Sequence, residues 1–203
     1  MSEALAREVE AKGIRDPAVL RAIAELARER FVPDRLRGDA ELDRPLPIGL
    51  GQTISQPYVV AYMTEQLGLT GRERVLEVGT GSGYQTAVLA RLAARVWSIE
   101  RLGPLAARAR ALLLDALHLG NVELREGDGA LGWPEAAPFD RILVTAAACA
   151  VPEALEAQLA PGGRMILPVG PEEGSQVLRR VDCAADGTLT STDLLAVRFV
   201  PLL

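Results

Sequence analysis

Residues 74–85, with the sequence RVLEVGTGSGYQ, have the residue types and spacing of a small-ligand site. A short apolar strand is expected to end near the carboxylate of Glu77, and Gly79, Gly81 and Gly83 follow at alternate positions. Glycine has no Cβ and tolerates a positive φ, so a glycine turn between a strand and a helix lets a ligand approach the backbone closely. The segment therefore predicts a binding turn.

The spacing of the glycines distinguishes two classes of nucleotide ligand. Dinucleotide-binding turns follow G-x-G-x-x-G and direct backbone N–H groups and a helix N-terminus at a pyrophosphate. Here the pattern is G-x-G-x-G, and Glu77 stands just ahead of it. A carboxylate would repel a pyrophosphate but attract the ammonium group of a methionine-like moiety. The turn therefore favours S-adenosylmethionine over NAD.

Further candidate ligands follow the other strands that the sequence predicts. Glu100 ends the second strand, about 20 residues after Gly79, where an acidic residue commonly takes the ribose hydroxyls of an adenosine ligand. Asp128, with Gly129 beside it, could accept a hydrogen bond from the adenine amine, although Asp-Gly is also an ordinary turn. Thr145 begins a run of small residues after the fourth strand, which would leave space for a cofactor.

A second polar cluster lies at residues 47–57, with the sequence PIGLGQTISQP. Taken alone, it is interpreted as a capping segment in which Ser55 is the N-cap of a helix over residues 57–68. No histidine lies nearby in sequence to make Ser55 a nucleophile of the triad type. His118 is the only histidine, and we expect a structural role for it late in a helix.

The remaining patterns predict an α/β fold with a mostly parallel, Rossmann-like sheet and right-handed crossovers. Strands are expected at residues 75–78, 96–99, 122–124, 141–145 and 164–167, and helices at 85–94, 104–118 and 152–159. A turn is expected at 161–163, and a closing hairpin at 176–181 and 194–200 gives the sheet an antiparallel edge.

The first 70 residues are predicted to form a helical and loop region ahead of the sheet, within one domain of residues 1–203. Helices are expected at residues 3–12, from Asp16 to about Phe31, and at 57–68. Residues 34–55 are expected to be irregular, and a long structureless stretch in a compact domain is often a functional loop.

Composition narrows the function classes. The chain has 203 residues and a net charge of −5, which argues against a large nucleic-acid footprint. No apolar run approaches the roughly 20 residues that a membrane helix needs, and no signal peptide is recognised. Cys149 and Cys183 lie far apart and are expected to be buried free thiols in the cytoplasm. We expect a monomer with neither a metal site nor a membrane partner.

The two clusters together resemble the protein-L-isoaspartate (D-aspartate) O-methyltransferase family. The resemblance rests on GQTISQP at 51–57 followed by LEVGTGSGYQ at 76–85, and it spans nearly the whole chain in order. Further matching motifs lie at residues 30–33, 127–129, 139–142, 160–163 and 197–202. The glycine turn marks only class I methyltransferases, whereas the TISQP loop and the RFVPL tail are more specific. Residues 149–151 match poorly the proline-containing stretch expected there.

The resemblance implies methyl transfer from S-adenosylmethionine to the α-carboxylate of isoaspartyl residues in damaged proteins, with S-adenosylhomocysteine as product and D-aspartyl residues as a further candidate substrate. It assigns Ser55 to binding and orienting the substrate carboxylate. The residues expected around the cofactor are Gln52, Thr53 and Ile54 as a border, Glu77, Gly79, Thr80, Gly81, Ser82 and Gly83 at the methionine end, Glu100 at the ribose, Asp128 and Gly129 at the adenine, and Thr145. The backbone of residues 198–200 is a candidate to pair with the substrate peptide as an added strand.

Four alternatives stay open at this point. The same chemistry could act on a normal aspartate of a dedicated precursor peptide. A tRNA methyltransferase would share the fold, but the acidic charge balance disfavours it. A NAD-dependent oxidoreductase is disfavoured by the glycine spacing. An adenosine-binding module without turnover would bind the cofactor and form no product.

Overall fold

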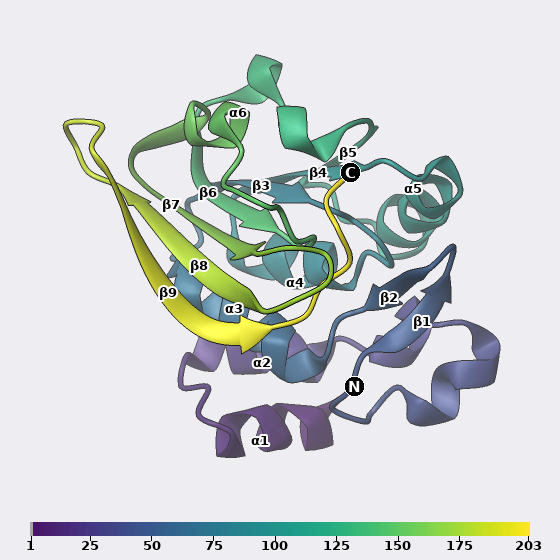
Figure 1. Cartoon of the computed structure of the whole chain (residues 1–203). Helices are drawn as coiled ribbons and strands as arrows, with labels where there is room; N and C mark the ends of the chain where they lie inside the picture. Colours follow the sequence, from purple (N-terminus) through teal and green to yellow (C-terminus); the bar gives the residue numbers. More distant parts are fainter. Residues whose placement is uncertain (1) are drawn as a thin grey trace.

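A computed structural model describes residues 2–203 and shows one central sheet flanked by helices (Figure 1). The strand order is β5-β4-β3-β6-β7-β8-β9, with β3 to β7 parallel and β8 and β9 antiparallel. The strands are β3 (Arg74–Val78), β4 (Arg95–Glu100), β5 (Val122–Glu126), β6 (Phe139–Val144), β7 (Leu159–Val169), β8 (Gln176–Cys183) and β9 (Leu189–Val197). The predicted fold class is confirmed.

The central strands are continuous apolar runs because helices and loops cover both of their faces. Val75, Leu76 and Val78 of β3, and Ile142 and Val144 of β6, are at most 1% exposed. By contrast, β9 lies at the edge of the sheet and its first five residues are exposed. The core therefore lies under β3 and β6, whose carboxyl ends face the candidate site.

Six α-helices surround the sheet in the described part of the chain: α1 (Glu3–Ala11), α2 (Pro17–Glu25), α3 (Pro57–Leu67), α4 (Tyr84–Leu92), α5 (Gly103–Arg110) and α6 (Glu153–Glu156). Short 3₁₀ turns lie at Arg28–Phe31, Asp34–Asp39, Gly129–Leu131 and Pro134–Ala136, and a π-helical turn at Ala111–Ala116 extends α5. Among residues 2–203, no helix combines the length and apolar character needed to cross a membrane.

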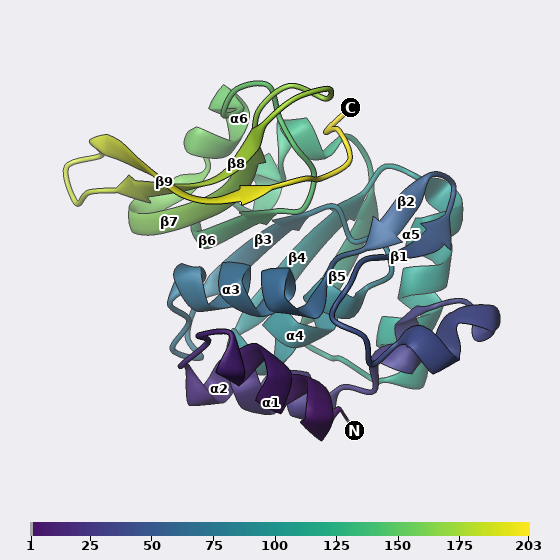
Figure 2. The same cartoon turned by 60° about the horizontal axis from the view of Figure 1, so that its bottom comes forward.

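The N-terminal helices pack against the same core as the sheet helices. Figure 2 shows α1 and α2 side by side, on the outer side of α3 and α4. Leu5 and Ile23 from α1 and α2 belong to one buried cluster with Tyr84, Val88 and Leu113. The single domain over residues 1–203 stays a prediction, which this shared core supports.

The segment at 34–55 is not irregular throughout, contrary to the prediction. Strand β1 (Leu46–Gly49) pairs with β2 (Gln52–Ile54) in an antiparallel hairpin. Its tip has φ values of 97°, 54° and 73° at Gly49, Leu50 and Gly51. Turns with positive φ join two strands tightly because their twist matches that of the strands.

Several predicted boundaries also shift. The helix predicted from Asp16 ends at Glu25, because Leu26 and Ala27 have extended backbones. The helix at 152–159 shrinks to α6, and β7 begins at Leu159 and includes the turn predicted at 161–163. The second strand of the hairpin covers Leu189–Val197 rather than 194–200.

Two single-residue predictions have different outcomes. Cys183 is buried, but Cys149 is exposed, so the prediction of two buried thiols is wrong for Cys149. It lies outside the strands, just after two buried alanines that form isolated bridges to Pro201 and Val169. His118 adopts a φ of 54° just after the π-helical turn, a conformation that ends a helix.

Candidate functional site

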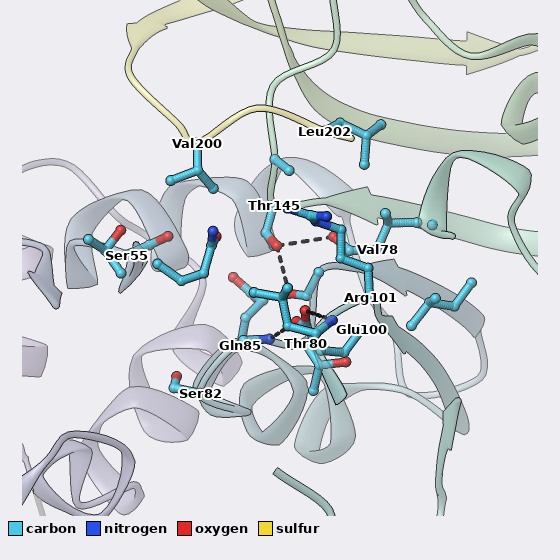
Figure 3. Close-up of a pocket in the computed structure, with 18 of the residues that line it drawn as sticks. Ser55, Val78, Thr80, Ser82, Gln85, Glu100, Arg101, Thr145, Val200 and Leu202 are labelled. Carbon is cyan, nitrogen blue, oxygen red and sulfur yellow. Dashed lines mark hydrogen bonds between the residues drawn. The ribbon is translucent and has the colours of Figure 1, made fainter. Parts of the chain in front are cut away.

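A cavity lies beyond the carboxyl ends of β3, β4 and β6, where ligands of open α/β sheets bind. Figure 3 shows Ser55 and Val200 on one side of it and Glu100 and Arg101 on the other. The cavity is lined by eleven of the fourteen predicted site residues, namely Gln52, Thr53, Ile54, Ser55, Gly79, Thr80, Gly81, Ser82, Glu100, Gly129 and Thr145. The predicted set is thus largely brought together in space.

The glycine turn needs glycine for steric and conformational reasons. A Cβ added at Gly79 would lie 2.3 Å from Oγ1 of Thr145, and Gly79 and Gly81 have φ values of 95° and 54°. The Thr145 hydroxyl donates to the carbonyl oxygens of Val78, at 3.0 Å, and Gly79, at 2.7 Å. Thr145 therefore fixes the course of the turn as well as lining the cavity.

Glu100 is held rigidly at the end of β4 and is only 7% exposed. Its Oε2 accepts a hydrogen bond from the Gly81 amide at 2.7 Å, and its Oε1 accepts from the Leu102 amide at 2.9 Å. Each carboxylate oxygen has a second lone pair, so both can still accept from a ligand. This geometry suits the two hydroxyls of a ribose.

Glu77 lies beneath the turn and is not among the residues that line the cavity. Its Oε2 accepts from the hydroxyls of Thr86 and Ser98, each at 2.5 Å. Burial raises the pKa of Glu77 to about 8, against the opposing effect of these two hydrogen bonds. Ser98 in turn contacts the Thr80 hydroxyl at 2.6 Å. In this position Glu77 supports the turn from below.

Ser55 is free of the capping role that its sequence context suggested. The N-cap of α3 is Gln56, without a side-chain capping bond. Oδ1 of Asp43, which is distant in sequence, accepts instead from the Tyr58 amide at 2.7 Å. Arg28 is fully buried, and its guanidinium donates to the Ser55 carbonyl at 3.0 Å. The backbone of Ser55 is thereby anchored while its side chain lines the cavity.

Two further predicted residues lie away from the cavity lining. Gly83 is the N-cap of α4, and a Cβ there would meet the side chain of Leu113 at 3.0 Å. Asp128 is exposed, and its Oδ1 accepts from the Ala130 amide at 2.9 Å to cap a 3₁₀ turn. Their contacts with a cofactor stay predictions, as do the ligand roles of the other site residues.

The prediction missed several residues that complete the lining: Val60, Val78, Tyr84, Gln85, Ile99, Arg101, Leu102, Ala146, Val200, Pro201, Leu202 and Leu203. The last four of these belong to the tail at residues 198–203, which consists of RFVPL and Leu203. The sequence predicted RFVPL only as a family motif, and residues 198–200 as a contact with the substrate peptide. In Figure 1 this tail runs from β9 across the ends of the parallel strands.

A second groove adjoins the cavity and shares Thr53, Ser55, Thr145 and Val200 with it. The tail that separates them is held by two sets of bonds, of which Gln176 makes the first. Its Oε1 accepts from the Phe199 amide at 2.6 Å, and its Nε2 donates to the Phe199 carbonyl at 3.2 Å.

The second set of bonds belongs to Ala147. Its amide donates to the Val200 carbonyl, and its carbonyl accepts from the Leu202 amide, each at 2.8 Å. The tail is therefore fixed on both sides of Val200, which is the tail residue that lines both spaces.

Comparison with known proteins places this geometry in a family. A model of the family "Protein-L-isoaspartate(D-aspartate) O-methyltransferase (PCMT)" matches residues 1–203. The chain belongs to this family. It is 71% identical over 202 residues to "Protein-L-isoaspartate O-methyltransferase 1" of Anaeromyxobacter sp. (strain Fw109-5), covering 100% of this chain and 95% of that one. It is 57% identical over 196 residues to "Protein-L-isoaspartate O-methyltransferase" of Trichlorobacter lovleyi, covering 97% of this chain and 89% of that one.

Solved structures of proteins described as members of this family have the same fold. A chain described as protein-L-isoaspartate O-methyltransferase superposes with a TM-score of 0.88 at 31% identity, covering 99% of this chain. This chain spans 65% of the length of that one. A Plasmodium falciparum protein described as a putative member, in complex with S-adenosyl-L-homocysteine, has a TM-score of 0.86 at 25% identity, covering 100% and 98%.

Family membership confirms the resemblance predicted from the motifs, and with it S-adenosylmethionine as the methyl donor. The residues of the cavity fit this donor. Gly79 presents bare backbone to the cavity, because a Cβ there would meet the Thr145 hydroxyl, and Glu100 presents two fixed acceptors for a ribose. Gln85 adds a buried acceptor, Oε1, that has no hydrogen-bond partner among residues 2–203.

Proposed function

We propose that this chain transfers the methyl group of S-adenosylmethionine to the free α-carboxylate of L-isoaspartyl residues in damaged proteins and so initiates their repair. The observation that carries the proposal is the meeting of two spaces at Ser55: one beside the glycine turn, and one bounded by the tail. D-aspartyl residues are a further candidate substrate.

The residues fit a reaction that needs positioning rather than proton transfer. A carboxylate with a pKa near 4 is already ionised at neutral pH, so no general base is required. The donor supplies a methyl group on a sulfonium sulfur. The protein has to align the attacking oxygen with that methyl group and exclude water, since charge disappears as the bond forms.

Ser55 is assigned as the catalytic residue. It lines both spaces, and its hydroxyl can donate to one carboxylate oxygen while the other attacks. Gln52, Thr53 and Ile54 border the donor, Glu100 holds its ribose, and Gly129 with Asp128 lies at its adenine.

The tail is proposed to hold the substrate backbone. Gln176 occupies both the amide and the carbonyl of Phe199, so these groups are not free for a peptide. Alternate residues of an extended chain direct their backbone groups to opposite sides. An added peptide strand would therefore pair with Arg198 and with the amide of Val200.

Two synthetic peptides that differ only in isoaspartate against aspartate test the function. Each is incubated with the protein and S-adenosylmethionine labelled in its methyl group, and base-labile label is counted. We expect label in the isoaspartyl peptide alone. Label in the aspartyl peptide would favour a dedicated aspartyl substrate, and label in neither would contradict the proposal.

We further propose that the chain works as a monomer in the cytoplasm, without nucleic-acid or membrane partners. Its net charge of −5 opposes binding to nucleic acid, and its two cysteines are free thiols, as is common in reducing compartments. Light scattering coupled to size-exclusion chromatography would test the monomer, with a mass near 21.7 kDa expected.

A further inference from the structure

The side chain of Gln85 combines a fixed orientation with an unused acceptor. It stands in the first turn of α4, is 8% exposed and lines the cofactor cavity (Figure 3). Its Nε2 donates to the Thr64 hydroxyl at 3.0 Å. Its Oε1 is buried and accepts no hydrogen bond from any residue that the structure describes.

Thr64 determines which way the amide faces. Its hydroxyl donates to the Val60 carbonyl at 2.7 Å, so its proton is already committed within α3. The Thr64 oxygen can then only accept, which requires the NH₂ end of Gln85 on that side. The Gln85 carbonyl oxygen is consequently the atom left for a ligand.

The sheet order identifies the part of the donor that lies near Gln85. Strand β3, which carries the glycine turn, lies between β4 and β6. Glu100 ends β4 on one side, whereas α3 packs on β6 and β7 on the other. A ligand that crosses the end of β3 with its ribose at Glu100 has its opposite, methionine end beside α3 and Gln85.

The methionine end carries an ammonium group with three N–H donors, and a buried ammonium needs acceptors. Thr145 already donates to the carbonyl of Gly79, which leaves that oxygen one free lone pair for three N–H donors, and Glu77 lies outside the lining. We propose that Oε1 of Gln85 accepts a hydrogen bond from the α-ammonium group of S-adenosylmethionine and so positions the donor for transfer. This inference rests on the proposed function.

Calorimetric binding of two ligands tests the proposal: S-adenosylhomocysteine, and 5′-methylthioadenosine, which lacks the amino-acid end. Gln85→Met keeps the length of the side chain and removes the acceptor. Because a hydrogen bond to a charged group is stronger than a neutral one, we expect the Kd for S-adenosylhomocysteine to rise about tenfold or more. The Kd for methylthioadenosine should stay within about twofold, since its contacts are unchanged.

Two further variants separate ligand contact from packing. Gln85→Glu keeps an acceptor but loses the amide that donates to Thr64, and we expect it to retain most of the affinity for S-adenosylhomocysteine. Thr64→Val removes the hydroxyl that orients the Gln85 amide and keeps Oε1, so we expect it to reduce the preference for S-adenosylhomocysteine over methylthioadenosine by less than Gln85→Met does.

Equal weakening of both ligands by Gln85→Met would assign Gln85 a packing role and overturn the inference, as would a Gln85→Glu variant that binds as poorly as Gln85→Met. Wild-type protein that binds S-adenosylhomocysteine yet methylates no isoaspartyl peptide would contradict the proposed function alone. Absence of S-adenosylhomocysteine binding by the wild-type protein would contradict both.

Discussion

At the scale of single residues, the hydroxyl of Ser55 is proposed to act on the substrate and not on the donor. We expect Ser55→Ala to lower kcat/KM for an isoaspartyl peptide by about 10²-fold, because the attacking oxygen is then no longer held in line with the methyl group, and a small misplacement of reacting atoms has an effect of this size. The Kd for S-adenosylhomocysteine should stay within about twofold.

Ser175→Ala is a matched control, because Ser175 lines the second groove without touching the cofactor cavity. Steady-state kinetics and calorimetry on both variants make the comparison. A large loss of cofactor affinity in Ser55→Ala would refute this division of roles.

Glu77 gives a prediction about pH. Burial raises the pKa of Glu77 in the folded state to about 8, above its ordinary value of 4.5, so between these two pH values the folded state binds more protons than the unfolded state. The free energy of unfolding should therefore fall as pH rises through this window, by up to roughly 1.4 kcal/mol per pH unit from this one group.

Glu77→Gln removes this dependence, and urea unfolding from pH 5 to pH 9 would measure the difference. We expect the wild-type stability to fall relative to the variant as the pH rises. Parallel curves would show that Glu77 is ionised in the folded protein at neutral pH. It could then act as the counter-charge to the ammonium group that the sequence suggested.

At the scale of elements, Gln176 at the start of β8 holds the tail in place. Gln176 is 2% exposed and makes two hydrogen bonds with Phe199, each worth about 1 kcal/mol. We expect Gln176→Leu to raise KM for the peptide about tenfold, because the groove loses its wall, with a smaller effect on kcat.

Gln176→Glu keeps the acceptor for the Phe199 amide and should recover part of the peptide affinity. Steady-state kinetics with thermal unfolding of both variants would check this. A lower Tm with an unchanged KM would mean that the tail is a structural strap only.

Elements differ in how far sequence predicts them. The central strands are predicted because their apolar runs are continuous, and the glycine turn because no other residue fits its backbone. The β1–β2 hairpin was missed because only Leu46 and Ile48 carry its alternation, between prolines and glycines. Its turn places Leu50 at a φ of 54°, which is unfavourable for a residue with a β-carbon. Leu-Gly is not one of the residue pairs, such as Asn-Gly, that indicate a hairpin turn in a sequence.

The candidate site shows the same limit. The glycines and Glu100 were predicted from their types and spacing, and Ser55 only from the family resemblance of its loop, whereas Gln85 looks like an ordinary polar residue in a first helical turn. Its orientation depends on Thr64, a contact 21 residues away in sequence, and so belongs to the tertiary structure. Glu77 was predicted at the methionine end of the cofactor, but its burial beneath the turn, outside the cavity lining, is equally a tertiary property.

At the scale of the whole molecule, the cofactor cavity joins distant parts of the chain, from Gln52 in the hairpin to Leu203 in the tail. A ligand that binds only the folded state stabilises it by mass action, by about 2.7 kcal/mol at a concentration of 100 times Kd. For a chain of this length that corresponds to a rise in Tm of about 5–10 °C.

We therefore expect S-adenosylhomocysteine at 100 times its Kd to raise Tm by that amount, and NAD at the same concentration to leave Tm unchanged. The reason lies at Glu100 and the glycine turn: both ligands offer a ribose to Glu100, but NAD must also place a pyrophosphate where the spacing supplies no G-x-G-x-x-G cradle. Differential scanning calorimetry measures both shifts in one series. A comparable rise in Tm with NAD would mean that the cavity recognises only the adenosine part of either ligand. The glycine turn would then not be what favours S-adenosylmethionine over NAD.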